Sequence, residues 1–310
     1  MKKIQTIPKR KKSLLQILCE PKVAGYVFIL PFITGFLLFI ALPMMLSFGF
    51  SFTRYNILES PVFIGLENYK NMFTSDPKFW KVFRVTMYYV LFSVPLRLIM
   101  ALLVALLLVK SSRLSGLYRA VYYLPSIIGS SVAVAILWKR MFASDGVINA
   151  LLKLIHIDSK VPWLGRTDTA IWVLILLAVW QFGSPMLIFI AGLKQIPNSY
   201  YEAASIDGAN AWQKLIRITI PALTPILFFN FLMQTISGFM AFTESYLITE
   251  GGPFDKTLFY SVYLFEKAFA FYDMGYASAL AWILLMIIGI FTVLIFKSSD
   301  YWVFYESKGD

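Results

Sequence analysis

Six long apolar stretches restrict the folds open to this chain of 310 residues more than any other feature. They lie at about 25–50, 85–109, 118–140, 170–193, 222–247 and 274–297. About 20 apolar residues are enough to cross a bilayer, and such a segment must be helical because lipid offers its backbone no hydrogen bonds. Only 15% of the residues are charged and 59% are hydrophobic, which excludes an ordinary soluble domain. We therefore predict an all-α polytopic membrane protein with six transmembrane helices.

The basic residues predict the orientation of these helices. Residues 1–24 hold seven lysines and arginines against the single acid Glu20, and the short link 110–119 holds three basic residues and no acid. Segments rich in Lys and Arg stay in the cytoplasm, and an even number of spans places both termini on one side. We therefore predict a basic cytoplasmic tail over 1–24, a transmembrane domain over 25–297 and a cytoplasmic tail over 298–310.

Charge and rare residue types argue against several other functions. More than half of the formal charge of +11 lies in the N-terminal tail beside a span, so anionic lipid rather than nucleic acid is its expected partner. The first span is longer than a removable signal peptide and lacks a small-residue cleavage site. Cys19 and His156 are the only residues of their types, which argues against a disulfide, a metal site and histidine-based catalysis. No Walker-type phosphate loop is present, so the chain is not expected to be an enzyme or to hydrolyse ATP itself.

One polar segment between the fourth and fifth spans, at 195–221, combines helix caps with a glycine turn. Asp207-Gly208 is a turn signal that should end a helix. Two pairs of residues have the spacing of a capping box, Ser199 with Glu202 and Asn210 with Gln213. The segment therefore predicts two short helices joined at the glycine.

This segment resembles the EAA loop of ABC importer permeases. That loop has the pattern Glu-Ala-Ala, three residues, Gly, nine residues and Ile-x-Leu-Pro. Residues that fall in register here are Glu202, Ala203, Ala204, Gly208, Ile218 and Pro221, with Ile220 in place of Leu. The resemblance implies that a cytoplasmic ATPase docks on the loop. It assigns the coupling role to Glu202, Ala203, Ala204, Asp207 and Gly208.

Short motifs elsewhere extend the resemblance to sugar-type permeases of the maltose and glycerol-phosphate kind. In order they are Gly65-Leu66-Glu67-Asn68-Tyr69, Leu124-Pro125, Asp145-Gly146-Val147-Ile148-Asn149, Gly192-Leu193, Ile196-Pro197 and Thr249-Glu250-Gly251-Gly252-Pro253. The match covers nearly all of the chain after residue 25, without the large extracellular insertion of the maltose subunit. The residues themselves also predict an amphipathic helix in the outer loop 51–84 and a rigid non-helical turn at 249–253.

The resemblance implies a function and a set of partners. The chain would be one permease subunit of an ATP-driven carbohydrate importer, for an oligosaccharide, in the bacterial inner or plasma membrane. The implied partners are a second permease, a cytoplasmic ATPase dimer, an extracytoplasmic solute-binding protein, the carbohydrate and the lipid bilayer. The chain itself is expected to bind no cofactor, since ATP and Mg would be held by the ATPase.

Polar residues within the spans indicate a substrate path. Asn230, Gln234 and Ser237 share one helix face, with Gly238 beside them. Such a face within lipid must contact protein or a wet cavity, so it forms either a helix-packing seam or part of a path. The resemblance assigns Gln234 and Gly238 to the substrate side. In span four, Trp180 and Gln181 are further candidates, because a ring stacks on a pyranose and an amide bonds its hydroxyls; the alternative for Trp180 is simple packing.

Two hypotheses from other classes remain open at this point. An ion-gradient-driven secondary transporter or channel would need ionisable groups inside the spans, and the candidates are Arg97 and Glu244. Such proteins are often built from two repeats, and no internal repeat is visible. A structural or assembly subunit without a transport path would not need the polar face of span five.

Overall fold

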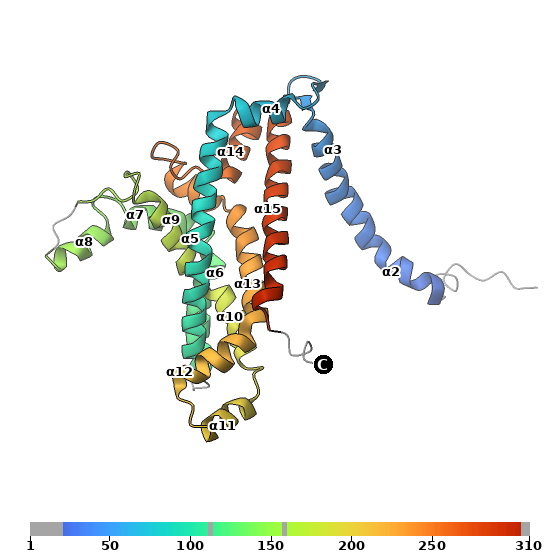
Figure 1. Ribbon diagram of the computed structural model, residues 1–310. Helices are drawn as coiled ribbons and strands as arrows, with labels where there is room; N and C mark the ends of the chain where they lie inside the picture. The colour runs from blue at the N-terminus through green and yellow to red at the C-terminus, as the bar shows by residue number, and fades with distance from the viewer. Residues whose placement is uncertain (1–20, 111–113, 157–159, 305–310) are drawn as a thin grey trace, which may run out of the picture.

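The computed structural model describes residues 21–110, 114–156 and 160–304, and its elements are almost all helices (Figure 1). Four helices in this part of the chain could each span a membrane, at Gly25–Phe50, Pro77–Leu108, Ala211–Phe239 and Met274–Trp302. Two bent pairs could each form a further span, Ser115–Ile128 with Val132–Met141 and Ala170–Trp180 with Gly183–Leu193. The predicted all-α polytopic fold is therefore confirmed. Most of the predicted tail 1–24, and residues 305–310 of the second tail, lie outside the described residues.

The elements follow in this order. The first half contains α2 (Pro21–Phe36), the π-helical turn η1 (Leu37–Ala41), α3 (Leu42–Phe50), β1 (Thr53–Arg54), β2 (Val62–Phe63), α4 (Glu67–Thr74), α5 (Pro77–Leu108), α6 (Ser115–Ile128), α7 (Val132–Met141) and α8 (Val147–Leu154). The second half contains α9 (Ala170–Trp180), α10 (Gly183–Leu193), α11 (Asn198–Ile206), α12 (Ala211–Lys214), η2 (Leu215–Thr219), α13 (Ile220–Phe239), η3 (Ser245–Thr249), α14 (Tyr260–Phe265), η4 (Glu266–Ala270) and α15 (Met274–Trp302). The only sheet among the described residues is the antiparallel pair β1–β2.

Helix α5 forms the centre of the bundle. It packs against α9, α10 and α13, and α13 packs in turn against α10 and α15. Ala101 and Ala105 on α5 are fully buried, which lets neighbouring backbones approach closely. Buried positions such as Val82, Val94 and Val104 recur along its length, so it contacts protein over most of its course. Its central place makes it the scaffold for the other spans.

The third and fourth predicted spans are broken. The chain turns by 97° between α6 and α7 and by 41° between α9 and α10. Ser131 starts α7 by accepting a hydrogen bond from the amide of Val134 at 3.3 Å. The prediction of one helix over 118–140 therefore needs correction. Its apolar composition continues through the bend, so hydropathy alone does not reveal the break.

The bent fourth span touches α6 at Gly183. A Cβ at this position would lie 2.5 Å from the carbonyl oxygen of Tyr122 and 2.6 Å from the Cα of Tyr123. Because these are backbone atoms, no rotamer change can relieve the contact. We expect Gly183→Leu to destabilise the protein by about 1–3 kcal/mol or more and to lower its melting temperature. Gly289→Leu is the control, since that position has open space around it; equal melting temperatures for the two variants would contradict the prediction.

The first span stands apart from the rest of the chain. Figure 1 shows α2 and α3 leaning away from the other helices, and none of the most apolar window of Gly25–Phe50 is buried within the chain. Its contact with the bundle is close to its end, where the ring of Phe48 meets that of Trp282 at 4.8 Å between centroids. An apolar helix without protein around it must face lipid or another chain.

The end of the bundle that carries α4 is held together by Asp76. This carboxylate caps α5 by accepting hydrogen bonds from the amides of Lys78 and Phe79, and it also accepts the hydroxyls of Tyr263 and Tyr276. Burial acts to raise the pKa of Asp76, but these four hydrogen bonds outweigh it, so its pKa lies below the ordinary value. Their contribution to stability is complete above the ordinary pKa of an aspartate. It is lost as the pH falls through the lowered pKa of the folded state.

Two elements predicted for the loops at this end are present. The helix predicted in the outer loop 51–84 is α4, although Phe79 and Trp80 belong to the following helix α5. Its place in the membrane interface stays a prediction. The turn at 249–253 is non-helical. Glu250 and Gly251 have φ angles of 53° and 79°, and the Gly252–Pro253 peptide bond is cis.

Candidate functional site

The polar segment 195–221 folds as two helices joined at Gly208. Helix α11 ends at Ile206, and Gly208 has a φ angle of 77°, which L residues rarely adopt. The second predicted capping box is confirmed. The amide of Gln213 donates to Oδ1 of Asn210 at 2.9 Å, and the amide of Asn210 donates to Oε1 of Gln213 at 2.8 Å. Helix α12 then runs without interruption through η2 into α13.

The first predicted capping box is wrong. Pro197 occupies the N-cap position of helix α11, two residues before the predicted cap Ser199, and no side chain caps the helix. Ser199 therefore lies inside the helix, where its amide is already in the first turn. Proline pre-sets the chain for a helix start without needing a side-chain cap, and this local effect displaced the Ser-x-x-Glu signal.

The loop presents an exposed surface away from the bundle. Figure 1 shows α11 at the end of the molecule opposite α4. The predicted coupling residues Glu202, Ala203, Asp207 and Gly208 are exposed, and Ala204 is half-buried. Two apolar side chains project beside them, with Ile206 88% exposed and Trp212 68% exposed. Such exposed apolar groups next to a rigid turn are typical of a docking surface.

The loop is tied to the base of α13 by side-chain hydrogen bonds. The hydroxyl of Tyr201 lies 2.9 Å from Oγ1 of Thr219, and Nζ of Lys214 donates to Oγ of Ser205 at 2.6 Å. A force on α11 would therefore reach α13 directly.

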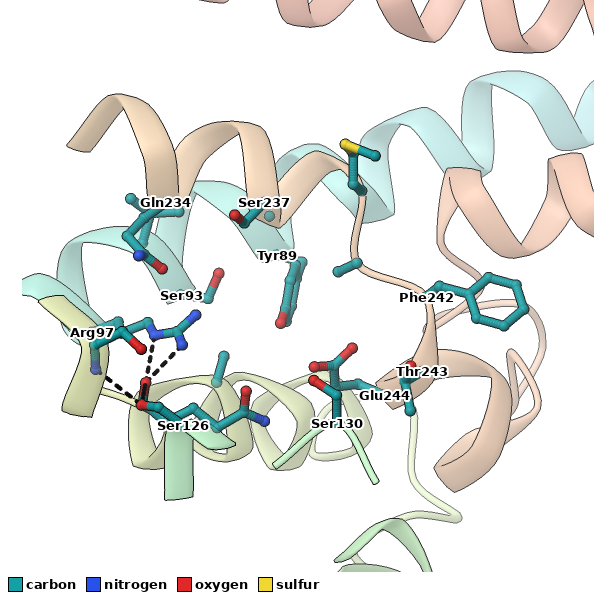
Figure 2. A pocket seen from close by; sticks show the side chains of 17 residues that line it. Tyr89, Ser93, Arg97, Ser126, Ser130, Gln234, Ser237, Phe242, Thr243 and Glu244 are labelled. Carbon is teal, nitrogen blue, oxygen red and sulfur yellow. Dashed lines mark hydrogen bonds between the residues drawn. The ribbon is translucent and has the colours of Figure 1, made fainter. Parts of the chain in front are cut away.

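A polar cavity of about 400 Å³ lies inside the bundle (Figure 2). Four parts of the chain surround it: α5, the residues between α6 and α7, the α9–α10 bend, and the end of α13 with the segment after it. Its lining residues are Tyr89, Ser93, Val94, Arg97, Ser126, Ser130, Ala178, Gln181, Ser184, Gln234, Ser237, Gly238, Met240, Ala241, Phe242, Thr243 and Glu244. Most of the polar ones are hydroxyls and amides, which can both donate and accept hydrogen bonds. The cavity therefore suits a small polyhydroxylated molecule.

Three of the five predicted path residues line this cavity. They are Gln181, Gln234 and Gly238. Asn230 lies outside the lining; it is completely buried, and neither of its side-chain polar atoms has a partner among the described residues. Trp180 also lies outside it and packs on Trp138 at 5.6 Å between ring centroids. The structure brings Gln181 and Gln234 together from spans that are separate in sequence.

The bend between α9 and α10 positions Gln181. Its backbone carbonyl lies at the break in the helix. It accepts hydrogen bonds from Nε and Nη2 of Arg97 at 3.0 and 2.6 Å and from the hydroxyl of Ser126 at 2.8 Å. The side chain is only 5% exposed. Its Nε2 is attracted by the carboxylate of Glu244, but it has no partner within hydrogen-bond geometry in the described part of the chain. A buried amide with an unused donor at a cavity wall is ready to bind a ligand.

The contribution of α5 to the cavity was not predicted from the sequence. Tyr89, Ser93 and Arg97 are spaced four residues apart and therefore share one helix face. This spacing was visible in the sequence and could have identified the face. Among lining residues only Arg97 and Glu244 are charged, and both were predicted only as candidates for an ion-driven mechanism. No three His, Cys, Asp or Glu side chains come together as a metal site in the described residues.

Comparison with known proteins identifies the family. Residues 77–302 match the family described as "Binding-protein-dependent transport system inner membrane component". The chain belongs to this family. The matched region runs from the start of α5 to the end of α15 and includes both the cavity and the exposed loop. The protein is thus a multi-pass inner-membrane permease component.

Relatives of this permease component are similar over nearly the full chain. It is 57% identical to the "Probable ABC transporter permease protein YesP" of Bacillus subtilis (strain 168), over 93% of this chain and 94% of that protein. It is 33% identical to the "Lactose transport system permease protein LacF" of Rhizobium radiobacter, over 89% of this chain and 94% of that protein. The arabinooligosaccharide permease protein AraP of Bacillus subtilis (strain 168) is 31% identical, with coverages of 90% and 89%.

Solved structures share the fold of this permease component. A chain from the crystal structure of a bacterial ABC transporter that imports the acidic polysaccharide alginate matches with a TM-score of 0.75. The alignment covers 89% of this chain and 95% of that chain at 22% sequence identity. The arrangement of the helices around α5 is therefore a shared architecture.

Proposed function

We propose that this chain is one of two unlike permease subunits of an ATP-driven oligosaccharide importer, and that the polar cavity is part of its translocation path. The observation that carries the proposal is the buried Nε2 of Gln181 at the wall of that cavity, which is attracted to Glu244 but forms no hydrogen bond within the described residues. Leaving a buried donor unpaired costs free energy, which is recovered when a substrate hydroxyl accepts from it. Relatives named for lactose and arabinooligosaccharides support a carbohydrate as that substrate.

The exposed loop is the proposed docking site for a cytoplasmic ATPase. Its residues Glu202, Ala203, Ala204, Asp207 and Gly208 would meet the ATPase, which would hold ATP and Mg in place of this chain. The ties of α11 to the base of α13 support this role, because α13 carries Gln234 and Gly238 at the cavity. Movement imposed at the loop would then change the cavity. In this proposal the α11 end and both termini face the cytoplasm.

The remaining partners follow from the same proposal. A second permease would cover the isolated span Gly25–Phe50, whose apolar surface is unburied within this chain. An extracytoplasmic binding protein would meet the α4 end, and anionic lipid would meet the basic tail. The path would run between the two permeases, with the cavity on this side of it.

Uptake by the complete complex tests the proposal. We expect proteoliposomes containing this chain, its second permease and its ATPases to take up labelled oligosaccharides only when ATP and the loaded binding protein are present. Ionophores that collapse proton and sodium gradients should leave the rate unchanged. Uptake that persists without ATP and stops with ionophores would instead support a gradient-driven transporter. A complex that takes up no oligosaccharide under any condition would argue against a translocation path.

A further inference from the structure

We propose that Arg97 makes this path selective for acidic sugars by pairing with a carboxylate of the substrate. The inference rests on the proposed function and names a chemical class for its substrate, a mono- or oligosaccharide that carries a uronate group. Three observations carry it: the position of Arg97, the absence of a direct ion pair to Arg97 among the described residues, and the presence of Glu244 as the second charged residue of the cavity.

Arg97 lies near the middle of α5 and reaches into the cavity. Its Nε and Nη2 donate to the carbonyl of Gln181, and Figure 2 shows its guanidinium among the side chains that line the space. A guanidinium has five N–H donors, so the carbonyl leaves most of this capacity unused. The two hydrogen bonds orient the group without neutralising it, because a carbonyl has no net charge.

No carboxylate of the described residues forms an ion pair with Arg97. The ion pairs of this part of the chain lie at other positions, and all involve exposed or half-buried side chains. A charge inside a membrane protein is costly and is usually paired or functional. Hydroxyls and amides would be enough to bind a neutral sugar. The guanidinium therefore indicates an anionic group on the molecule that passes through.

Glu244 would bind the hydroxyl groups of the substrate. It is the only other charged residue of the lining and comes from a different element. The two charges attract each other across the cavity, but they form no ion pair within 4 Å. A carboxylate accepts hydrogen bonds from sugar hydroxyls, so Glu244 suits the hydroxylated face of a ring. A uronate supplies both a carboxylate for the planar fork of Arg97 and hydroxyls for Glu244. A phosphate carries up to two negative charges, of which the single cation Arg97 can match only one, so it fits less well than a uronate.

The experiment compares sugars that differ only at the carboxyl group. The probes are labelled oligouronides from alginate and from polygalacturonate, and the same oligosaccharides after reduction of each carboxyl to a hydroxymethyl group. Two measurements are made on the full complex. One is ATP-dependent uptake with the binding protein, and the other is equilibrium binding to the purified complex without it, which removes any selection by the binding protein.

We expect the unmodified complex to prefer the oligouronides in both measurements. Arg97→Met should lower uptake and binding of oligouronides by about tenfold or more, as loss of a charge-assisted bond implies, and should change the reduced sugars much less. Arg97→Lys keeps the positive charge but loses the two parallel N–H donors of the guanidinium. Its uptake and binding of oligouronides should lie between those of the unmodified complex and of Arg97→Met. Ser126→Ala is the matched control, because it removes another donor to the same carbonyl of Gln181, without a charge. Ser126 also lines the cavity, so its loss should affect acidic and reduced sugars alike and leave the ratio between them unchanged.

Several results would overturn the inference alone. If Arg97→Met lowers uptake and binding equally for acidic and reduced sugars, Arg97 only holds the α9–α10 bend in place. A preference of the unmodified complex for the reduced sugars, or no preference between the two kinds of sugar, would also overturn it. Absence of ATP-dependent uptake for every sugar is a different outcome, because it removes the proposed function as well.

Discussion

Replacement of Gly208 by valine is expected to stop coupled transport while leaving the protein folded in the membrane. The φ angle of 77° at Gly208 is strained for any L residue and worst for a β-branched one. No atom lies within 4 Å of a Cβ built there, so the effect arises from the backbone and not from a clash. Strain of about 1–3 kcal/mol corresponds to roughly five- to 150-fold weaker docking of the ATPase. The measurements are copurification of the ATPase and its stimulation by loaded binding protein.

A matched control separates backbone geometry from side-chain size at this position. Asparagine adopts the left-handed conformation more readily than other L residues, so Gly208→Asn should retain most of the stimulated ATP hydrolysis. Both variants should melt at nearly the same temperature as the unmodified protein, because the exposed loop can relax the backbone strain when no ATPase is docked. Normal stimulation in Gly208→Val would remove the turn from the coupling mechanism.

Replacement of Gln181 by methionine is expected to lower transport and at the same time to stabilise the protein. Methionine keeps the unbranched shape that the side chain needs beside Gly129, where the Gln181 Cδ lies 2.4 Å from an added Cβ. It removes a buried amide whose Nε2 has no partner in the described chain, and such a group costs about 1–3 kcal/mol. The melting temperature should therefore rise. Uptake should fall by about tenfold, because the substrate loses a hydrogen bond made inside the membrane.

The opposite signs of these two effects make the test specific. Gln195→Met is the control, since the same substitution on an exposed side chain outside the cavity should change neither stability nor uptake. Gln234→Met should also lower uptake, with a smaller gain in stability because Gln234 is only half-buried. A fall in melting temperature with unchanged uptake per assembled complex would mean that Gln181 has a structural partner within the protein.

Features governed by neighbouring residues could be predicted from the sequence. The apolar stretches, the turn at Gly208 and the Asn210–Gln213 capping box each depend on contacts within a few residues, and the structure contains all of them. Two local predictions were wrong because a second local effect competed with the pattern on which the prediction rested. Pro197 displaced the cap predicted at Ser199, and a cap at Ser131 broke an apolar stretch that hydropathy could not divide.

The cavity depended on information that no local pattern contains. Asn230 and Gln234 are one helical turn apart on the same face, yet Asn230 is completely buried and only Gln234 reaches the cavity. Periodicity predicts which residues share a helix face, but it does not predict where along the helix that face loses contact with its neighbours. That position is set where α5, α13 and the α9–α10 bend diverge. The sequence by itself thus determined the membrane class, the helical faces and the loop. Tertiary packing alone decided that Arg97, Gln181 and Glu244 line one cavity, because their relative positions depend on how separate helices cross.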